Sequence, residues 1–382
     1  MPTVTSRIGD TLFPIGIATG AAFCNRNAER TELAQNILSG SHTWIMGVRR
    51  FGKTSLVSQV ALELGRKRNV KVHTESVDLF VVHNITTLDK AIRDAVGRLT
   101  AQFVPKRRKA MDALLEIFDA FKPKVTLGSK GISIELFTAE PSAASINEVL
   151  LALDRAAEAY GRRAVLILDE FQQIALIDRQ HAIEGAIRNV AQRTKATSFV
   201  FLGSERTLLQ QMFENRKRPL YKLCRRLNVG RIAAEHYHAY FADAAKARWQ
   251  KQLRDDSAER ILELTDRHPF YVNLLCLELW RHRNPPKPDD VTALWGSLLE
   301  KERHEIHLAL STLSTNQRAV LAALARRPTS RPTSKEFLAA AGMAASSMNQ
   351  AVDVLLSKDF LRRDEADVYE VIDPLVKAYL AR

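Results

Sequence analysis

Cysteine is scarce in this chain of 382 residues, and its placement excludes two kinds of architecture. The three cysteines, Cys24, Cys224 and Cys276, are far apart and odd in number. They therefore form neither the paired spacing of a zinc site nor a disulfide framework. A reducing compartment is the simplest setting for such cysteines, so we expect a cytoplasmic protein.

Long hydrophobic runs are also missing. No apolar run approaches the ~20 residues that span a bilayer. Residues 1–20 lack a basic start followed by an apolar core, so we expect no signal peptide. Neither an internal repeat nor a low-complexity tract is present. With 46% hydrophobic and 26% charged residues, the composition is typical of a soluble globular chain long enough for two or three domains.

Acidic residues are fewer than basic residues, and the formal net charge is +13. A basic chain attracts phosphates, which makes nucleic acid a candidate partner. One compact basic cluster is "PKRRK" at 105–109. A solvated basic surface with no bound polyanion explains the charge equally well.

The stretch "GVRRFGKTSL", residues 47–56, contains the pattern G-x-x-x-x-G-K-[ST] from Gly47 to Thr54. Residues 42–47 form a short apolar run that predicts a buried strand. After Lys53, apolar side chains recur at helical spacing and predict a helix. The pattern therefore stands between a strand and a helix, which is the context that a phosphate-binding P-loop requires.

A loop of this kind binds phosphate through its backbone, because its glycines let successive N–H groups point inward. The positive N-terminal end of the following helix faces the same anion. We expect Lys53 to reach the β and γ phosphates, Thr54 to offer its hydroxyl to Mg²⁺, and Ser55 to lie beside the α phosphate. The predicted binding loop comprises Gly47, Val48, Arg49, Arg50, Phe51, Gly52, Lys53, Thr54 and Ser55. A glycine-rich turn without a ligand is the alternative.

Two acids end a second apolar run, "AVLILDEFQQI" at 164–174. Asp169 at a strand end is suited to hold Mg²⁺ through water, and Glu170 to deprotonate an attacking water. Together with the P-loop, this pair predicts ATP hydrolysis with Mg²⁺. The alternative is a switch that binds nucleotide and hydrolyses it poorly. A third run, 198–204, would deliver Ser204 to the same sheet edge, either to bond the γ phosphate or water or as an ordinary polar strand end.

The strands predicted in the first half are apolar and separated by helices, which indicates a parallel sheet with helices on both faces. We predict strands at 42–47, 70–79, 164–174 and 198–204, and a last strand in "LNVGRI". We predict helices at 27–39, 88–121, 145–161 and 181–194, and a hairpin at 122–137 around Gly128 and Gly131.

Helices dominate from about residue 234 onward. "NPPKPDD" at 284–290 predicts a break before a new helix. Residues 314–382 show three short helical patterns, and 360–373 adds two strand-like runs around a turn, which together suggest a winged helix. The predicted fold is therefore α/β, with a P-loop core at 1–233, a helical lid at 234–310 and a winged helix at 311–382.

Several of these stretches resemble one known group, the archaeal-type P-loop ATPases. This family is related to the STAND signal-transduction ATPases and to the origin-recognition initiators of the AAA+ class. The P-loop version "GVRRFGKTSL" is similar to the family's G-x-R-R-x-G-K-T-S-L, and "LILDEFQQI" to its Walker B segment. The other similar stretches, which extend the resemblance over nearly the whole chain, are "FCNRNAERTEL", "FLGSERTLLQQMFENRKRPLYKLCRRLNV" and "DRHPFYVNLLC".

The resemblance implies further site residues. Phe23 and Arg26 match a motif that lies near the adenine in the family. His268 and Pro269 match its lid motif, where a helix N-terminus faces the nucleotide, although Asp266 and Arg267 stand where glycines are usual. Proline in a first helical turn also agrees with helix capping, and a capping role for His268 without nucleotide contact is the alternative.

The arginines of the loop need not touch phosphate, because the amides do so. Arg49 and Arg50 are expected to fix the loop against acidic groups or a neighbouring element, or to sense its occupancy. An arginine that stabilises charge on the γ phosphate from another subunit is more plausible at Arg225 or Arg226, just before the last strand. A solvated basic helix end is the alternative.

The segment "AASSMNQAVDVLLSKDF" at 344–360 takes the position of a winged-helix recognition helix. Polar residues at its start could read base edges, and flanking arginines could hold phosphates. The residues concerned are Ser346, Ser347, Asn349 and Gln350 on the helix, Arg326, Arg327, Arg331 and Lys335 before it, and Arg362 and Arg363 in the wing. A domain that packs against protein is the alternative, because the helix itself has only Lys358 and also carries Asp353.

Two functions fit these features. The first is an ATPase that acts as a conformational switch or motor on a protein or DNA partner, or within a homo-oligomer. The second is an ATP-gated DNA-binding regulator or initiator that uses the winged helix. A small-molecule kinase is a weaker third possibility, because no separate acceptor site is visible.

Overall fold

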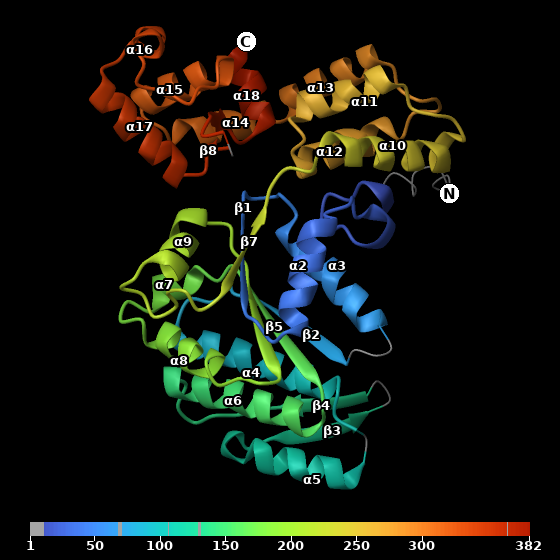
Figure 1. The fold of residues 1–382 in the computed structure, drawn as a ribbon, viewed down its shortest axis with the longest axis vertical. Coiled ribbons are helices and arrows are strands. Elements are labelled where there is room, and N and C mark those ends of the chain that lie inside the picture. The colour runs from blue at the N-terminus through green and yellow to red at the C-terminus, as the bar shows by residue number, and fades with distance from the viewer. Residues whose placement is uncertain (1–10, 68–70, 106, 129–130, 365) are drawn as a thin grey trace. The chain divides into compact units, whose positions relative to one another are not determined.

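The computed structural model describes residues 11–67, 71–105, 107–128, 131–364 and 366–382. Three parts of the sequence predictions lie outside the described residues: Lys106 of the basic cluster, Glu365 of the predicted wing, and the first ten residues. The first ten residues bear on the expectation of no signal peptide. The chain forms two compact units (Figure 1). The sheet unit comprises Arg26–Arg49 and Lys53–Val229; the helical unit comprises Met1–Asn25, Arg50–Gly52 and Gly230–Arg382.

A five-stranded parallel sheet forms the centre of the sheet unit, with strand order β2-β5-β6-β1-β7. The apolar runs of the sequence become its buried inner strands, since both faces of β5 and β6 are covered. This confirms the predicted parallel sheet. The strands are β1 (Thr43–Gly47), β2 (Val72–Asp78), β5 (Arg163–Asp169), β6 (Thr197–Phe201) and β7 (Arg225–Val229).

Helices cover both faces of this sheet (Figure 1). One face carries α2 (Asn27–Leu38) and α3 (Lys53–Arg66). The other carries α4 (Ile85–Ala101), α6 (Ala143–Ala159), α8 (Ala182–Ala191) and α9 (Arg206–Glu214), with the short α7 (Gln173–Ile177) after β5. Local capping fixes where two of these helices begin, because Asn84 and Ser142 accept hydrogen bonds from the third residues of α4 and α6.

The structure corrects two predicted elements. The single helix expected at 88–121 is interrupted after α4 and resumes as α5 (Arg108–Ile117) and the 3-10 turn η2 (Asp119–Phe121). Pro105 accounts for the interruption, because a residue before proline avoids helical backbone. The strand expected at 164–174 ends at Asp169, where Glu170 turns to φ +52°.

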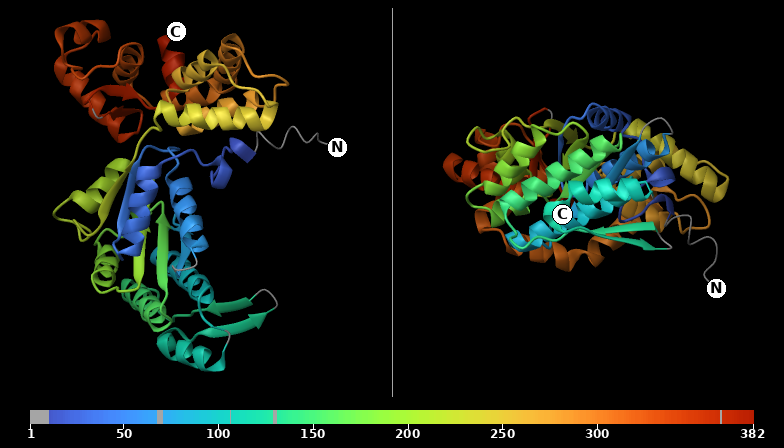
Figure 2. Two further views of the ribbon diagram at one scale, coloured as in Figure 1. Left: turned by 45° about the vertical axis from the view of Figure 1, so that its right-hand side comes forward. Right: turned by 90° about the horizontal axis from the view of Figure 1, so that it is seen from below.

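The predicted hairpin is present as β3 (Lys124–Gly128) and β4 (Gly131–Glu135), which pair with Gly128 opposite Gly131. In the left view of Figure 2 it extends from the sheet unit beside α5. It packs on α4, where a Cβ on Gly97 would lie 2.2 Å from the carbonyl oxygen of Ile134. Glycine at position 97 therefore permits close contact between the helix and the hairpin.

The helical unit has a hydrophobic core of its own, to which the N-terminal segment contributes Phe13. The Phe13 ring lies 4.6 Å from the ring of Trp280 and 5.4 Å from that of Tyr240. No helix in the described residues has both the length and the apolar character needed to cross a bilayer. After η1 (Gly20–Ala22), the helices are α10 (Ala234–Trp249), α11 (Asp255–Thr265), α12 (Pro269–Leu279), α13 (Pro288–Lys301) and α14 (Arg303–Ser311).

The C-terminal part of the helical unit has the arrangement predicted for a winged helix. Helix α15 (Thr315–Arg326) packs on α16 (Lys335–Ala341), α17 (Ala345–Ser357) and α18 (Pro374–Ala381). Strands β8 (Leu361–Arg363) and β9 (Tyr369–Val371) form the antiparallel wing. Asp373 caps α18 by accepting from the N–H groups of Leu375 and Val376.

Two non-glycine residues end α11 in the left-handed region: Asp266 and Arg267 both have φ +51°. These are the positions where the family resemblance leads one to expect glycines. The carboxylate of Asp266 is held by ion pairs to Arg231 and, at 3.6 Å, to Lys377. These ion pairs offset the free-energy cost of left-handed backbone at Asp266. Arg267 has no ion pair within the described residues that would offset the same cost at its own position.

We predict that Arg267→Gly raises the free energy of unfolding by up to about 1 kcal/mol, because glycine adopts left-handed backbone without a Cβ clash. Chemical denaturation measures this change. The matched control Glu259→Gly, within α11, should lower the same free energy by about 1 kcal/mol. A loss of stability in Arg267→Gly would show that the side chain of Arg267 outweighs its backbone strain.

Candidate functional site

The strand order brings the predicted catalytic segments to one edge of the sheet. Strand β6 lies between β5 and β1, so the carboxyl ends of these three strands are adjacent. Asp169 ends β5, Gly47 ends β1, and Ser204 follows β6. This edge is where ligands sit in open parallel sheets.

The P-loop has the backbone that its glycines and its following helix predict. Arg50 (φ +62°) and Gly52 (φ +84°) are left-handed, and α3 begins at Lys53. A Cβ on Gly47 would lie 2.7 Å from the carbonyl oxygen of Val229 on β7, so this position accepts only glycine without movement. The ammonium of Lys53 donates to the carbonyl oxygens of Gly47 (2.9 Å) and Val48 (3.1 Å), which places the positive charge within the loop.

Thr54 and Asp169 meet as the motif predicts. The Thr54 hydroxyl donates to Oδ2 of Asp169 at 3.1 Å, and the backbone N–H of Glu170 donates to Oδ1 at 2.9 Å. Burial raises the pKa of Asp169, and the charges of Glu170 and Asp78 add to the rise against these two hydrogen bonds. A hydroxyl and a carboxylate are the oxygen donors that Mg²⁺ prefers, so this pair fits the predicted metal.

Glu170 is held by a polar cluster on the neighbouring strand end. Its Oε2 accepts from the Ser204 hydroxyl at 2.8 Å, from the Ser204 N–H at 3.2 Å, and from the amide of Gln172. Its left-handed backbone directs the chain back toward β6 after Asp169. Ser204 thus contacts the candidate base directly.

Gln172 and Asp78 are site residues that sequence reasoning missed. Gln172 is 1% exposed, and its Oε1 is buried without a hydrogen-bond partner in the described residues. A Cβ on Gly203 would lie 2.0 Å from that oxygen, so Gly203 leaves room for the Gln172 amide. Asp78 pairs in register with Asp169 across β2 and β5. Gln172 could have been proposed from its position two residues after Glu170. Asp78 could be placed at the site only once the strand order was known.

The tip of the P-loop, Arg50–Gly52, belongs to the helical unit. There the guanidinium of Arg50 lies over the ring of Phe270, 4.2 Å from its centroid. The buried ring of Phe51 meets His268 edge-on at 4.7 Å. The role of Arg50 in fixing the loop stays a prediction. Arg49 is exposed and has no hydrogen bond or ion pair within the described residues.

His268 lies just before Pro269, which is the first residue of α12. His268 occupies the N-cap position of α12, as the capping alternative requires, although its side chain makes no capping hydrogen bond. Its contact with nucleotide stays a prediction. The ring is 2% exposed. Burial, with the charge of Arg231 nearby, lowers the pKa of His268 to about 3, so the imidazole is neutral at physiological pH.

Arg225 and Arg226 lie inside β7, not before it, and at its amino end. They pair in register with Thr43 and Trp44, whereas the P-loop follows the carboxyl end of β1. Arg226 donates to Glu214 at 2.8 Å and lies over the Trp44 ring. Within one chain they are thus on the edge opposite the P-loop, and a role in a second subunit's site stays a prediction.

The two residues matched to an adenine-proximal motif fall in different units. Arg26 is 5% exposed, has φ +58° and pairs with Glu29 at 2.9 Å at the start of α2. Phe23 follows η1 in the helical unit. Their contact with adenine stays a prediction.

In the winged helix, α17 presents the exposed polar residues Ser346, Asn349 and Gln350, with Ser347 half-buried. Arg331 and Lys335 are exposed. The expectation that Arg362 holds phosphate is wrong, because its side chain is 14% exposed and pairs with Glu370. Other predicted contacts are engaged internally: Arg363 bonds the Tyr369 hydroxyl and lies 3.4 Å from Asp367, and Arg327 pairs with Glu336.

Comparison with known proteins supports this fold. A family model described as a probable winged helix domain matches residues 306–382. No curated protein matches the chain by sequence. Among solved structures, a Walker-type ATPase of Pyrococcus abyssi superposes with TM-score 0.67 and 17% identity, covering 97% of this chain and 100% of that one. The ORC2 protein of Aeropyrum pernix, in complexes with ADPNP and ADP, gives TM-score 0.56 and 15% identity over 97% and 95%.

These comparisons confirm the predicted fold class. Similarity at these identities concerns the fold: a parallel sheet flanked by helices, as in Walker-type ATPases, and a C-terminal winged helix. The boundaries at 233 and 310 stay predictions.

We predict that Asp169→Asn stabilises the nucleotide-free protein at neutral pH, because it removes a charge whose burial is unfavourable. The pKa of Asp169 is raised in the folded state. The free-energy cost of burying its charge is therefore present above that pKa and disappears as pH falls through it. The gain in melting temperature should therefore shrink in acid. The exposed control Asp112→Asn should show no gain; equal melting temperatures for Asp169→Asn and wild type at neutral pH would contradict the assignment.

We also predict that His268 makes the protein less stable in acid. Its folded-state pKa is depressed, so its contribution is present above about pH 6.5 and is lost at about 1.4 kcal/mol per pH unit as pH falls toward 3. Unfolding free energies measured between pH 7 and pH 5 should fall less steeply in His268→Gln than in wild type. The exposed control His304→Gln should keep the wild-type slope, and an unchanged slope in His268→Gln would refute this.

Proposed function

We propose that this protein is a Mg²⁺-dependent ATPase that uses nucleotide binding and hydrolysis as a conformational switch or motor on a protein or DNA partner. One observation carries the proposal. The ends of β1, β5 and β6 bring together a loop lysine, a hydroxyl–carboxylate pair and a second, hydrogen-bonded carboxylate. These are the groups that phosphoryl transfer to water requires.

Phosphate binding is assigned to the P-loop and Lys53. The Lys53 ammonium bonds two loop carbonyls and is 8% exposed, so its charge is concentrated where loop amides and the α3 N-terminus meet. A triphosphate tail would accept bonds from this ammonium in place of the carbonyls. Positive charge at this point stabilises the additional negative charge that develops on the leaving phosphate.

Thr54 and Asp169 are assigned to the metal. When bound, Mg²⁺ neutralises phosphate charge and orients the γ phosphate. The Thr54 hydroxyl would ligate it directly, and Asp169 would hold it through water. Burial raises the pKa of Asp169, and a cation bound nearby would compensate for that burial.

Glu170 is assigned as the base that orients and deprotonates the attacking water. Its carboxylate is fixed by Ser204 and Gln172, which restrict it to one region of the sheet edge. Ser204 thereby positions the base, and its hydroxyl is also within reach of a water that Glu170 would bind. A base held in this way loses little motion when the reaction begins.

The choice of adenine nucleotide is supported by the fold and by its relatives' names. ADPNP and ADP are the ligands named for the Aeropyrum pernix ORC2 structure. Phe23, Arg26, His268 and Pro269 remain the proposed contacts outside the phosphate site, as the resemblance implies.

The second candidate function is a DNA-binding regulator or initiator gated by ATP. The observations that favour it are the exposed polar start of α17 and the exposed Arg331 and Lys335, which precede it in the sequence. In a gel shift, Asn349→Ala should change the preference for DNA sequence, and affinity should fall steeply with salt. ATP turnover measured with and without DNA shows whether the two activities are coupled.

We predict that Lys53→Ala abolishes tight ATP binding, whereas Glu170→Gln keeps binding and lowers turnover by about 10²- to 10⁴-fold. Lys53→Ala removes the charge that holds the phosphates, and Glu170→Gln removes only the base. Calorimetry measures binding, and phosphate release measures turnover. The exposed control Glu116→Gln should behave as wild type; undiminished turnover in Glu170→Gln would assign the base elsewhere.

A further inference from the structure

The edge of the sheet opposite the P-loop collects positive charge. The residues just before β2 and β5 are Lys71 and Arg162, and Lys195 lies two residues before β6. Backbone hydrogen bonds hold these starts together, from Arg163 N–H to the Lys71 carbonyl and from Ala164 N–H to the Ala196 carbonyl, both 2.9 Å. Parallel pairing therefore gathers side chains that are distant in the sequence.

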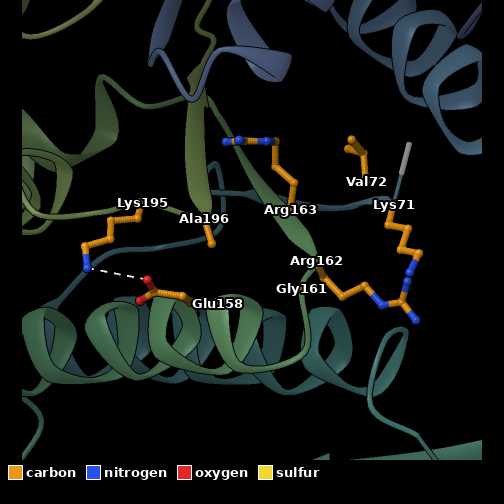
Figure 3. A pocket seen from close by; sticks show the side chains of 8 residues that line it. All are labelled: Lys71, Val72, Glu158, Gly161, Arg162, Arg163, Lys195 and Ala196. Carbon is orange, nitrogen blue, oxygen red and sulfur yellow. Dashed lines mark hydrogen bonds and ion pairs between the residues drawn. The ribbon is translucent and has the colours of Figure 1, made fainter. Parts of the chain in front are cut away.

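These residues line a pocket of about 470 Å³ (Figure 3). Its lining contains four cations, Lys71, Arg162, Arg163 and Lys195, and one acid, Glu158. In Figure 3, Lys71 and Arg162 extend toward one side, whereas Lys195 and Glu158 lie at the other. A volume of this size is within the range of ligand sites in proteins.

The cations of this pocket are poorly neutralised by the protein itself. Among the residues that the structure describes, Lys195 alone of these cations has an acidic partner, Glu158 at 3.4 Å. Lys71, Arg162 and Arg163 form no ion pair within the described residues, and Nε of Arg162 and one terminal nitrogen of Arg163 are buried there without a hydrogen-bond acceptor. Buried donors are normally satisfied, so these two nitrogens are exceptions.

A histidine next to this edge has a shifted pKa, for which burial is the larger cause. Burial, together with the charge of Arg162, lowers the pKa of His73 on β2. A simpler explanation is that the cations face the negative C-terminal end of α6. That end accounts for Arg162, which lies three residues after the helix, but not for Lys71, which precedes β2, or for Arg163, which begins β5.

A second basic pocket, of about 600 Å³, adjoins the first along the chain. Tyr160 lines it, and the next residue, Gly161, lines the first pocket. Its cations are Arg107 and Lys109, both exposed, from the basic cluster that the sequence shows at 105–109. The turn after α6 is thus bordered by cations on both sides, which suits a ligand that carries several phosphates.

We propose that this edge of the sheet unit binds the backbone phosphates of a nucleic-acid strand, at a site separate from both the P-loop and the winged helix. Arginine and lysine side chains are the groups that contact phosphates in protein–nucleic-acid complexes, with little dependence on sequence. A single phosphate would occupy part of one pocket, whereas a strand with several phosphates could contact both. The site needs no nucleotide hydrolysis, so it stands independently of the proposed ATPase activity.

The test is fluorescence anisotropy of a labelled oligo-dT strand with the full-length protein. The double variant Lys71→Ala/Arg162→Ala should bind the strand at least about tenfold more weakly. The slope of log K against log salt concentration should also be shallower by about 1.4, because each of the two lost phosphate contacts contributes about 0.7 on a single strand. The double variant Arg216→Ala/Lys217→Ala is the matched control, because it removes the same charge from exposed positions elsewhere on the sheet unit. It should retain wild-type affinity.

Two further variants separate this surface from other modes of binding. Arg107→Ala/Lys109→Ala should also weaken binding; unchanged affinity would limit the site to a single anion and overturn the strand assignment. If Arg331→Ala/Lys335→Ala in the winged helix abolished binding while Lys71→Ala/Arg162→Ala bound as wild type, the proposal would be wrong. Absence of oligo-dT binding by the wild-type protein at low salt would overturn it as well. Melting temperatures confirm that each variant is folded.

Discussion

Parallel pairing of β5, β6 and β1 is the constraint on which the candidate site depends. It brings the ends of three strands to one edge and places Ser204, which follows the middle strand, in contact with Glu170. The Thr54–Asp169 and Glu170–Ser204 contacts follow from this order, although each joins residues distant in the sequence. The same pairing gathers the starts of β2, β5 and β6, so the opposite edge becomes the basic one.

Backbone strain is concentrated around the site. Arg50 and Glu170 are non-glycine residues in the left-handed region, one within the P-loop and one directly after Asp169. Such residues persist only where the surroundings determine them, and here Arg50 lies over Phe270 while the Glu170 carboxylate is bonded by Ser204. In the helical unit, Asp266 is held similarly by Arg231, which also donates to Glu370 of the wing. These ion pairs connect the end of α11 to the winged helix.

The sequence predicted those parts of the structure whose signals are local. The strand, P-loop and helix around Lys53 follow from glycine spacing and apolar periodicity, and the β3–β4 hairpin from Gly128 and Gly131. The break after α4 was also readable from Pro105 but was missed. Features that depend on tertiary neighbours were not predictable: Asp78 in register with Asp169 and the inward Arg362 paired with Glu370. Strand order also decided that Arg225 and Arg226 lie away from the P-loop edge.

The central claim is that the P-loop edge binds a nucleoside triphosphate together with Mg²⁺. Titration calorimetry with a non-hydrolysable ATP analogue tests it most directly, first with Mg²⁺ and then with the metal chelated. The account predicts saturable heat with Mg²⁺ and a clear loss of affinity on chelation, because Thr54 and Asp169 bind the nucleotide only through the metal. Saturable binding that chelation leaves unchanged, or no heat in either condition, would contradict it.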